Sequence, residues 1–344
     1  MTAPATTISE GSLVLVTGAT GFVATHVIKA FLQRGYRVRG TVRNLEKASW
    51  LLTGLFKTYA DQGFLELVVV PNLAAEHAFD EAVKGVSAII HVASIVTFDS
   101  DPNKVIPQTV LGATSILEAA LKEPLVKRFV FTSSIVAATF PVAGNSTIVG
   151  PDTFNEAAIQ LAWAPGTPPS GSVVYSASKA EAEKAVWNFA KERRPHFDVN
   201  AVGPAMILGE PLHKTHLESA GAWLKQLFDG DQEEISSSPA FYSVDVKDTA
   251  LLHVAAALDP HVQGTRLQAW ADNTNWNEIL AILRRLYPTK IDTQDIKGLA
   301  GDKLTISTDQ TQSLALLKKW GNQEGWTPLE KTVADNAEAI WKLQ

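Results

Sequence analysis

The sequence contains no cysteine among its 344 residues. This absence excludes disulfide bonds, thiolate nucleophiles and cysteine-ligated zinc, and it is typical of proteins from a reducing compartment. The N-terminal stretch MTAPATTISEG also lacks the basic region and the apolar core of a signal peptide. We therefore expect a cytoplasmic protein.

Blocks of lysine or arginine are absent as well, and the formal net charge is −6. A nucleic-acid partner or an anionic membrane surface is therefore not expected. No apolar run reaches the length of a membrane-spanning helix, so we expect no membrane partner. With 46% apolar residues the chain can bury a large core, and its length favours two lobes. The oligomeric state, monomer or homodimer, stays open.

A strand, a glycine turn and a helix follow one another near the N-terminus. Leu13 to Val16 is an unbroken apolar run, typical of a strand buried on both faces of a parallel sheet. Glycines follow in the turn before the predicted helix. The absence of a side chain there lets the backbone approach a pyrophosphate at the helix N-terminus, so the turn predicts a dinucleotide site. The alternative is a turn that binds nothing. The expected cofactor contacts in this stretch are Gly18, Thr20, Gly21, Phe22 and Val23.

The second strand, predicted at 37–42, is followed at once by a basic residue, and no Asp or Glu stands at this strand end. An acidic side chain there would bind the ribose 2′-hydroxyl of NAD, whereas arginine matches a 2′-phosphate in charge and shape. Arg43, with Lys47 one helical turn later, therefore predicts NADPH or NADP+ as the cofactor. The alternative is that both side chains only solvate a loop.

Three further strands are predicted, at 65–70, 87–92 and 128–132, with a helix from about 108 to 121 before the last of them. Their carboxyl ends should meet at the sheet edge that holds the glycine turn, where ligands bind in open α/β sheets. His91 lies inside an apolar run, and a core histidine is the favoured interpretation. The residues expected at this edge of the sheet are Asn72 and Leu73 near the adenine, Ala93 beside the cofactor, and Ser133 and Ser134 with hydroxyls facing the cleft.

A helix rich in Ala, Glu and Lys is predicted at 175–193, after an aperiodic loop at about 139–172 that we expect to form part of a pocket wall. Tyr175 and Lys179 are four residues apart, so their side chains lie on one face of this helix. The spacing alone is weak evidence, because it also occurs by chance. Together with a nucleotide turn and a strand-end serine, it indicates a catalytic pair.

These motifs together resemble the short-chain dehydrogenase/reductase superfamily, in its extended branch. The stretches TGATGFVA, TVRN, HVAS, FVFTSS and YSASK are similar to the dihydroflavonol-reductase-like group, and the chain looks most like fungal NADPH-dependent aldehyde and carbonyl reductases. The resemblance implies Ser134 as the catalytic serine, Tyr175 as the acid and Lys179 as its helper. It also implies that Arg43 binds the 2′-phosphate and that Pro204 lies beside the nicotinamide.

Two positions depart from the pattern of this group. Plant dihydroflavonol reductases hold the flavonoid with an asparagine five residues after the catalytic serine, where this chain has Thr139. A flavonoid substrate is therefore not expected. The usual Asp-Leu after the third strand is Asn72-Leu73 here, which can still meet the adenine.

The fold expected is α/β, a Rossmann-type doubly wound parallel sheet with a smaller, mainly helical C-terminal substrate lobe. The predicted NADP-binding domain is 10–205 with a return segment at about 243–271, and the substrate-binding lobe is 206–242 with 272–344. Beyond residue 197 we expect strands at 198–202, 242–246 and 266–270, helices at 212–230 and from 246 to 258, and mainly helix from 275 onward.

Four residues are candidates for the substrate pocket, although most apolar residues of the second lobe are expected to be core. They are Phe98, Val174, Trp223 and Phe241. His213 and His216 are three residues apart, but no acidic residue completes an obvious ligand set, so no metal is expected.

The predicted activity is reduction of aldehydes and ketones, including keto esters and aryl ketones, to alcohols by hydride transfer from NADPH. Tyr175 is the expected proton donor. One alternative is a sugar-nucleotide epimerase or dehydratase of the same superfamily, which usually retains NAD. The other is a non-catalytic NADP-sensing regulator, which would tend to lack the tyrosine and the lysine. A small carbonyl compound is the expected partner.

Overall fold

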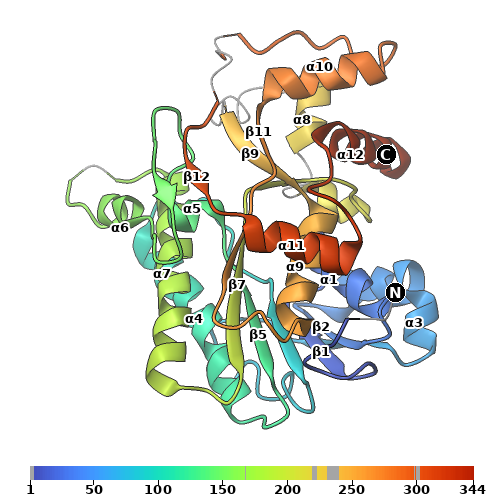
Figure 1. Cartoon of the computed structure of the whole chain (residues 1–344), viewed down its shortest axis with the longest axis vertical. Helices are drawn as coiled ribbons and strands as arrows, with labels where there is room; N and C mark the ends of the chain where they lie inside the picture. The colour runs from blue at the N-terminus through green and yellow to red at the C-terminus, as the bar shows by residue number, and fades with distance from the viewer. Residues whose placement is uncertain (1–3, 167, 219–222, 231–239, 298, 300–302) are drawn as a thin grey trace.

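A seven-stranded parallel sheet forms the centre of the protein in the computed structural model, which describes residues 4–166, 168–218, 223–230, 240–297, 299 and 303–344 (Figure 1). Its strands are β1 Leu13–Val16, β2 Arg37–Val42, β3 Leu65–Val69, β4 Ala88–His91, β5 Arg128–Thr132, β7 Asp198–Pro204 and β10 Arg266–Ala269. Their order is β10-β7-β5-β4-β1-β2-β3. The order reverses at β1, which pairs with both β2 and β4. The predicted doubly wound fold is confirmed.

Helices cover both faces of this sheet. One layer contains α1 Phe22–Leu32, α2 Leu45–Trp50, a π-helical turn Leu51–Leu55, α3 Lys57–Asp61, α9 Val246–Leu258 and α11 Thr311–Gly321; the other contains α4 Pro102–Leu121, α5 Ile135–Ala138, α6 Glu156–Ala162 and α7 Gly171–Arg193. Val14 and Val16 of β1 pack into the first layer, whereas Leu13 and Leu15 pack against α4 and α7. This two-sided burial is why β1 is apolar at every position.

A second, smaller group of elements lies at one end of the central sheet, at the top of Figure 1. It contains β8 Met206–Leu208, a 3₁₀ helix Lys214–Glu218, α8 Trp223–Asp229, β9 Ala240–Asp245, β11 Asp272–Asn275, α10 Trp276–Leu286 and α12 Leu329–Leu343. Its strands form a separate sheet of order β11-β9-β8. The apolar core of this group includes Leu208, Phe241, Trp276 and Ile340.

This small sheet was not predicted. The strand expected at 242–246 is present as β9, but it pairs with β8 and β11 and not with the central sheet. Neither partner is recognisable from its composition, because β11 reads Asp-Asn-Thr-Asn and β8 has three residues. Of the helix expected at 212–230, residues 219–222 lie outside the described residues.

Two other predicted boundaries differ from the structure. The segment expected to be a loop at 139–172 contains α6 and a short strand, β6 Ile148–Val149, which pairs with the distant β12 Ser307–Thr308. Helix α4 was predicted from 108 but begins at Pro102, with Pro107 inside it. A proline so near the start removes one helical hydrogen bond, and Asp101 caps this end by accepting from the Asn103 amide at 3.0 Å.

None of the helices in the described ranges is long and apolar enough to cross a membrane.

The glycine turn between β1 and α1 packs directly against Gly40 of β2. A Cβ at Gly40 would lie 2.7 Å from the Ala19 Cβ and 3.0 Å from a Leu67 methyl group. The next residue, Thr41, holds the turn, since its hydroxyl accepts from the Gly18 amide at 3.0 Å and its carbonyl from the Ala19 amide at 2.9 Å. The absence of a side chain at Gly40 therefore lets the turn lie directly on β2.

We expect Gly40→Ala to lower the free energy of unfolding by about 1–3 kcal/mol, because the added methyl group overpacks this contact. Gly54→Ala is the matched control, since nothing lies within 4 Å of a Cβ at that exposed position. Urea unfolding followed by circular dichroism measures both variants. Equal stability of the two would show that the contact at Gly40 relaxes at no cost.

Candidate active site

The turn between β1 and α1 leaves no room for side chains at its glycines. Gly18 has a φ of 70°, and a Cβ there would lie 3.1 Å from the Ala93 Cβ. A Cβ at Gly21 would lie 3.2 Å from the Gly18 carbonyl oxygen. Helix α1 begins directly after Gly21, and no side chain caps its N-terminus. The backbone therefore forms a cradle that fits the pyrophosphate of a dinucleotide.

The other predicted contacts of the turn lie around this cradle. Thr20 and Val23 are half-buried, whereas the Phe22 side chain is buried, with its ring centroid 5.7 Å from that of His216. His216 also contacts the Thr20 backbone and accepts from the Leu212 amide through Nδ1 at 3.1 Å. The segment after β8 therefore supports the turn from behind. Phe22 can meet a cofactor only through its backbone.

The end of β4 is fixed to the glycine turn through one hydroxyl. Thr17 Oγ1 lies 3.1 Å from His91 Nδ1 and accepts from the Ala93 amide at 2.9 Å. Burial, with a smaller effect of the Lys179 charge, lowers the pKa of His91 to about 3, so this imidazole is neutral. The ring stacks on Phe129 and Phe131. His91 is a core histidine, as predicted.

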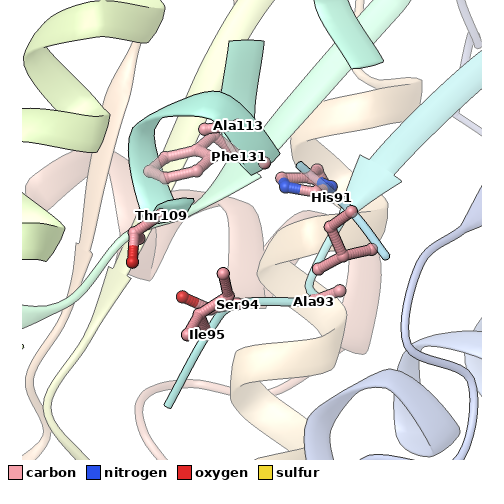
Figure 2. Close-up of a pocket in the computed structure, with 9 residues that line it drawn as sticks. His91, Ala93, Ser94, Ile95, Thr109, Ala113 and Phe131 are labelled. Carbon is pink, nitrogen blue, oxygen red and sulfur yellow. The ribbon is translucent and has the colours of Figure 1, made fainter. Parts of the chain in front are cut away.

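A small cavity lies between β4 and α4. It has about 10 Å³ of accessible space, enough for one water molecule. Figure 2 shows His91 and Phe131 across it from the segment Ala93 to Ile95. Leu73, one of the two residues expected at the adenine, also lines it, and Asn72 is exposed beside it.

Arg43 and Lys47 lie on the surface after β2. Lys47 is in the first turn of α2, where Asn44 caps the helix by accepting from the Lys47 amide at 2.9 Å. Neither basic side chain makes a hydrogen bond or an ion pair with any part of the chain that the structure describes. Both charges are therefore free to meet an anionic group.

The structure brings Ser134, Tyr175 and Lys179 together. Ser134 lies two residues after the end of β5 and is the N-cap of α5, whereas the other two residues lie on α7, one helical turn apart. The Ser134 side chain lies close enough to the Tyr175 phenol to lower its pKa. The buried Lys179 Nζ donates to the Thr132 carbonyl at 2.8 Å, so α7 is joined to the end of β5.

Burial shifts the pKa values of these groups in opposite directions. It raises the pKa of the Tyr175 phenol, an effect that the nearby Ser134 side chain partly offsets. It lowers the pKa of Lys179 to about 8, and the negative charge of Glu183 acts against this change. At neutral pH the phenol is therefore protonated, and the ammonium is mostly charged.

The two neighbouring serines point to different partners. Ser133 is buried, and its hydroxyl donates to Glu183 at 2.5 Å, whereas Ser134 is half-buried beside Tyr175. Glu183 also accepts two hydrogen bonds from Arg266. Neither Glu183 nor Arg266 was predicted to belong to the site. The signal in the sequence is an acidic residue four positions after Lys179, on the same face of the helix.

The four candidate pocket residues do not form one wall. Phe98 is 59% exposed, with its ring centroid 5.5 Å from that of Tyr175. Val174 is fully buried among side chains of α4, α6 and α7, and Phe241 is buried in the core of the small lobe. Trp223 stacks on Trp276 in that lobe. Their roles in substrate binding stay predictions, and only Phe98 lies beside the catalytic candidates.

The remaining predicted positions are close to the same strand ends. Pro204 is buried at the end of β7, the neighbour of β5. Thr139 is buried after α5, and its hydroxyl accepts from Asn145 Nδ2 at 2.8 Å. His213 stacks on Trp50, with 3.9 Å between ring centroids.

Taken together, the sheet order, the glycine cradle and the Ser-Tyr-Lys cluster define a dinucleotide-dependent oxidoreductase. Residues 14–264 match the NAD dependent epimerase/dehydratase family. The chain belongs to this family.

Relatives of known name cover nearly the whole chain. The chain is 40% identical over 339 residues to the NAD-dependent epimerase/dehydratase terH of Aspergillus terreus, with 96% of this chain and 97% of the relative covered. It is 37% identical over 333 residues to aldehyde reductase 2 of Sporidiobolus salmonicolor, with 95% and 96% covered. The predicted resemblance to fungal reductases is confirmed.

A solved structure has the same fold over almost the same length. The yeast methylglyoxal/isovaleraldehyde reductase Gre2, complexed with NADPH, superimposes with a TM-score of 0.78 at 26% identity. The match covers 96% of this chain and 98% of that one.

Proposed function

We propose that the protein is an NADPH-dependent carbonyl reductase that converts aldehydes and ketones, including keto esters and aryl ketones, to alcohols. The observation that carries this proposal is the placement of Ser134 beside the Tyr175 phenol, with the charged Lys179 one turn away, at the sheet edge that holds the glycine cradle. The names of the relatives, aldehyde reductase and methylglyoxal/isovaleraldehyde reductase, support the same class of substrate.

Reduction needs a proton donor at the carbonyl oxygen. When bound, the nicotinamide supplies the hydride for the carbonyl carbon. Tyr175 gives its phenol proton to the oxygen, so no free alkoxide has to form, and Ser134 donates a hydrogen bond to the same oxygen. Because burial raises the pKa of Tyr175, the phenol is in its proton-donating form at neutral pH. The direction of this shift suits reduction.

Lys179 supplies a buried positive charge beside the tyrosine. Its ammonium has three donors, of which one is directed to the Thr132 carbonyl. The others can hold the ribose of the nicotinamide. The same charge stabilises the phenolate that remains after proton transfer, which makes the phenol a better proton donor.

Cofactor choice follows from the surface after β2. Arg43 can bind a 2′-phosphate with a charge-assisted pair of hydrogen bonds, and Lys47 adds a second charge nearby. Both side chains are exposed, and no acidic residue stands at this strand end to bind a free ribose hydroxyl. The NADPH held by Gre2 supports this choice.

Tyr175→Phe tests the function. We expect kcat to fall about 10²-fold or more, the effect of losing a general acid, while NADPH binding changes little. The assay follows NADPH absorbance with a panel of aldehydes, keto esters, aryl ketones and one dihydroflavonol. Wild-type turnover in the variant would assign the proton to another group. Tightly bound NAD in the purified protein, with no turnover of the panel, would favour the epimerase alternative.

Ser134→Ala should also lower kcat about 10²-fold, because it removes a preorganised donor to the substrate oxygen. Ser133→Ala is the comparison variant and should cost less, since that hydroxyl points to Glu183 and not to Tyr175. Steady-state kinetics of both variants decide the matter. A larger loss for Ser133→Ala would place the catalytic hydroxyl one residue earlier.

For Arg43 we expect a role in cofactor choice. NADPH should be preferred over NADH by about 10²- to 10³-fold in kcat/KM, because each hydrogen bond to the phosphate contributes about 1.5–3 kcal/mol before screening by water. Arg43→Ala should remove most of this preference by weakening NADPH alone, and Lys47→Ala should have a smaller effect in the same direction. Arg37→Ala, at the other end of β2, is the control for an exposed arginine. Equal loss with both cofactors would make Arg43 structural.

A further inference from the structure

A fully buried ion pair lies directly behind the candidate catalytic residues. Glu183 on α7 is 0% exposed and Arg266 on β10 has a side chain that is 3% exposed. Arg266 Nε donates to Glu183 Oε1 at 2.7 Å and Nη2 donates to Oε2 at 2.8 Å. The pair is therefore bidentate, the geometry that holds a carboxylate most firmly.

The remaining hydrogen bonds of Glu183 reach toward the site. Oε2 accepts from the Ser133 hydroxyl at 2.5 Å, and Oε1 accepts from Trp187 Nε1 at 3.2 Å. Ser133 directly precedes Ser134, and Glu183 is one helical turn beyond Lys179. A single carboxylate is thus joined to the strand end that presents the serine and lies on the helix that presents the lysine.

Arg266 is held from its other side as well. Its Nη1 donates to the Thr153 carbonyl, and its guanidinium lies 4.7 Å from the centre of the Phe154 ring. These contacts hold the guanidinium on the side away from Glu183. The carboxylate of Glu183 is therefore paired with an arginine that has further partners of its own.

We propose that Glu183, anchored by Arg266, is a positioning residue that fixes the Ser133–Ser134 strand end and maintains the positive charge of Lys179. This inference rests on the proposed reductase function for its catalytic consequence. The effect of Glu183 on the pKa of Lys179 does not depend on which reaction the protein catalyses.

The charged and titratable groups around Lys179 can be named. Tyr175 lies one turn before it on α7 and is neutral, and His91 on β4 is neutral because its pKa is about 3. Arg266 is bound to Glu183, and of this pair only the carboxylate acts on the pKa of Lys179. Glu183 is the charge that raises the pKa of Lys179 against the effect of burial, which brings it to about 8. In an interior of low dielectric, one such charge has a large effect.

The double variant Glu183→Gln/Arg266→Met tests the proposal. The single Glu183→Gln variant would leave the Arg266 charge buried without a partner and can fail to fold, whereas the double variant removes both charges together. Without Glu183, Lys179 should lose its proton at lower pH. We expect the alkaline limb of the kcat profile to move to lower pH by up to about one pH unit, less than for the loss of a lone carboxylate, because the Arg266 charge is removed with it.

A matched control pair also has one member on α7. Arg193 of α7 and Glu118 of α4 also form a bidentate pair, but both are exposed. Glu118→Gln/Arg193→Met should leave the alkaline limb where it is. A double variant of Glu183 and Arg266 that is folded by circular dichroism, with its limb unmoved, overturns the proposal.

A direct titration separates this inference from the proposed function. Lysine Nζ or Cε signals are followed by NMR from pH 6 to 11, with the Lys179 signal identified by its loss in Lys179→Arg. The midpoint should fall by up to about one pH unit in the Glu183→Gln/Arg266→Met protein and stay constant in the control. A wild type that reduces no carbonyl compound would defeat the proposed function alone, whereas an unmoved midpoint would defeat this inference alone.

Discussion

The site depends on the packing of one helix against the end of one strand. Helix α7 meets β5 where Lys179 donates to the Thr132 carbonyl and Ser133 donates to Glu183. These two contacts join consecutive turns of the helix to consecutive residues of the strand end. Tyr175, one turn earlier, is thereby set beside Ser134. The relative position of the phenol and the serine hydroxyl is therefore determined by buried polar contacts and not by the loop that precedes the helix.

Burying the charges of Lys179, Glu183 and Arg266 costs free energy, and this cost is offset because each of the three groups has a polar partner. A buried lysine or arginine is unfavourable unless a partner satisfies it. Glu183 accepts from Arg266 and Ser133, and Lys179 donates to a backbone carbonyl. Gly171 shows a related constraint at the start of α7, since a Cβ there would lie 2.1 Å from the Phe98 carbonyl oxygen. Helix α7, which carries Tyr175, is therefore fixed in two ways. Lys179 and Glu183 make buried polar contacts with the end of β5, and Gly171 packs closely against the Phe98 backbone.

Much of the central sheet could be predicted from the sequence, because buried parallel strands are continuous apolar runs and their ends carry the functional residues. The strands at 37–42 and 128–132 and the Ser134, Tyr175 and Lys179 cluster follow from such local signals. The pairing of Glu183 with Arg266 could not be predicted, because it joins residues far apart in the chain. The same reason applies to β6 and β12, whose two-residue strands exist only through each other. Polar β11 is a strand because β9 lies beside it.

The opposite pKa shifts of Tyr175 and Lys179 have one consequence for the direction of the reaction. Burial favours the neutral phenol, the form that would donate a proton in the proposed reduction, and disfavours the phenolate that would accept one from an alcohol. Burial also disfavours the ammonium, and Glu183 restores it. If Tyr175 were buried without a charged lysine nearby, it would be a poor proton donor, because no positive charge would stabilise the phenolate left behind. The buried carboxylate behind the lysine therefore balances the two shifts, and it does so without touching the substrate.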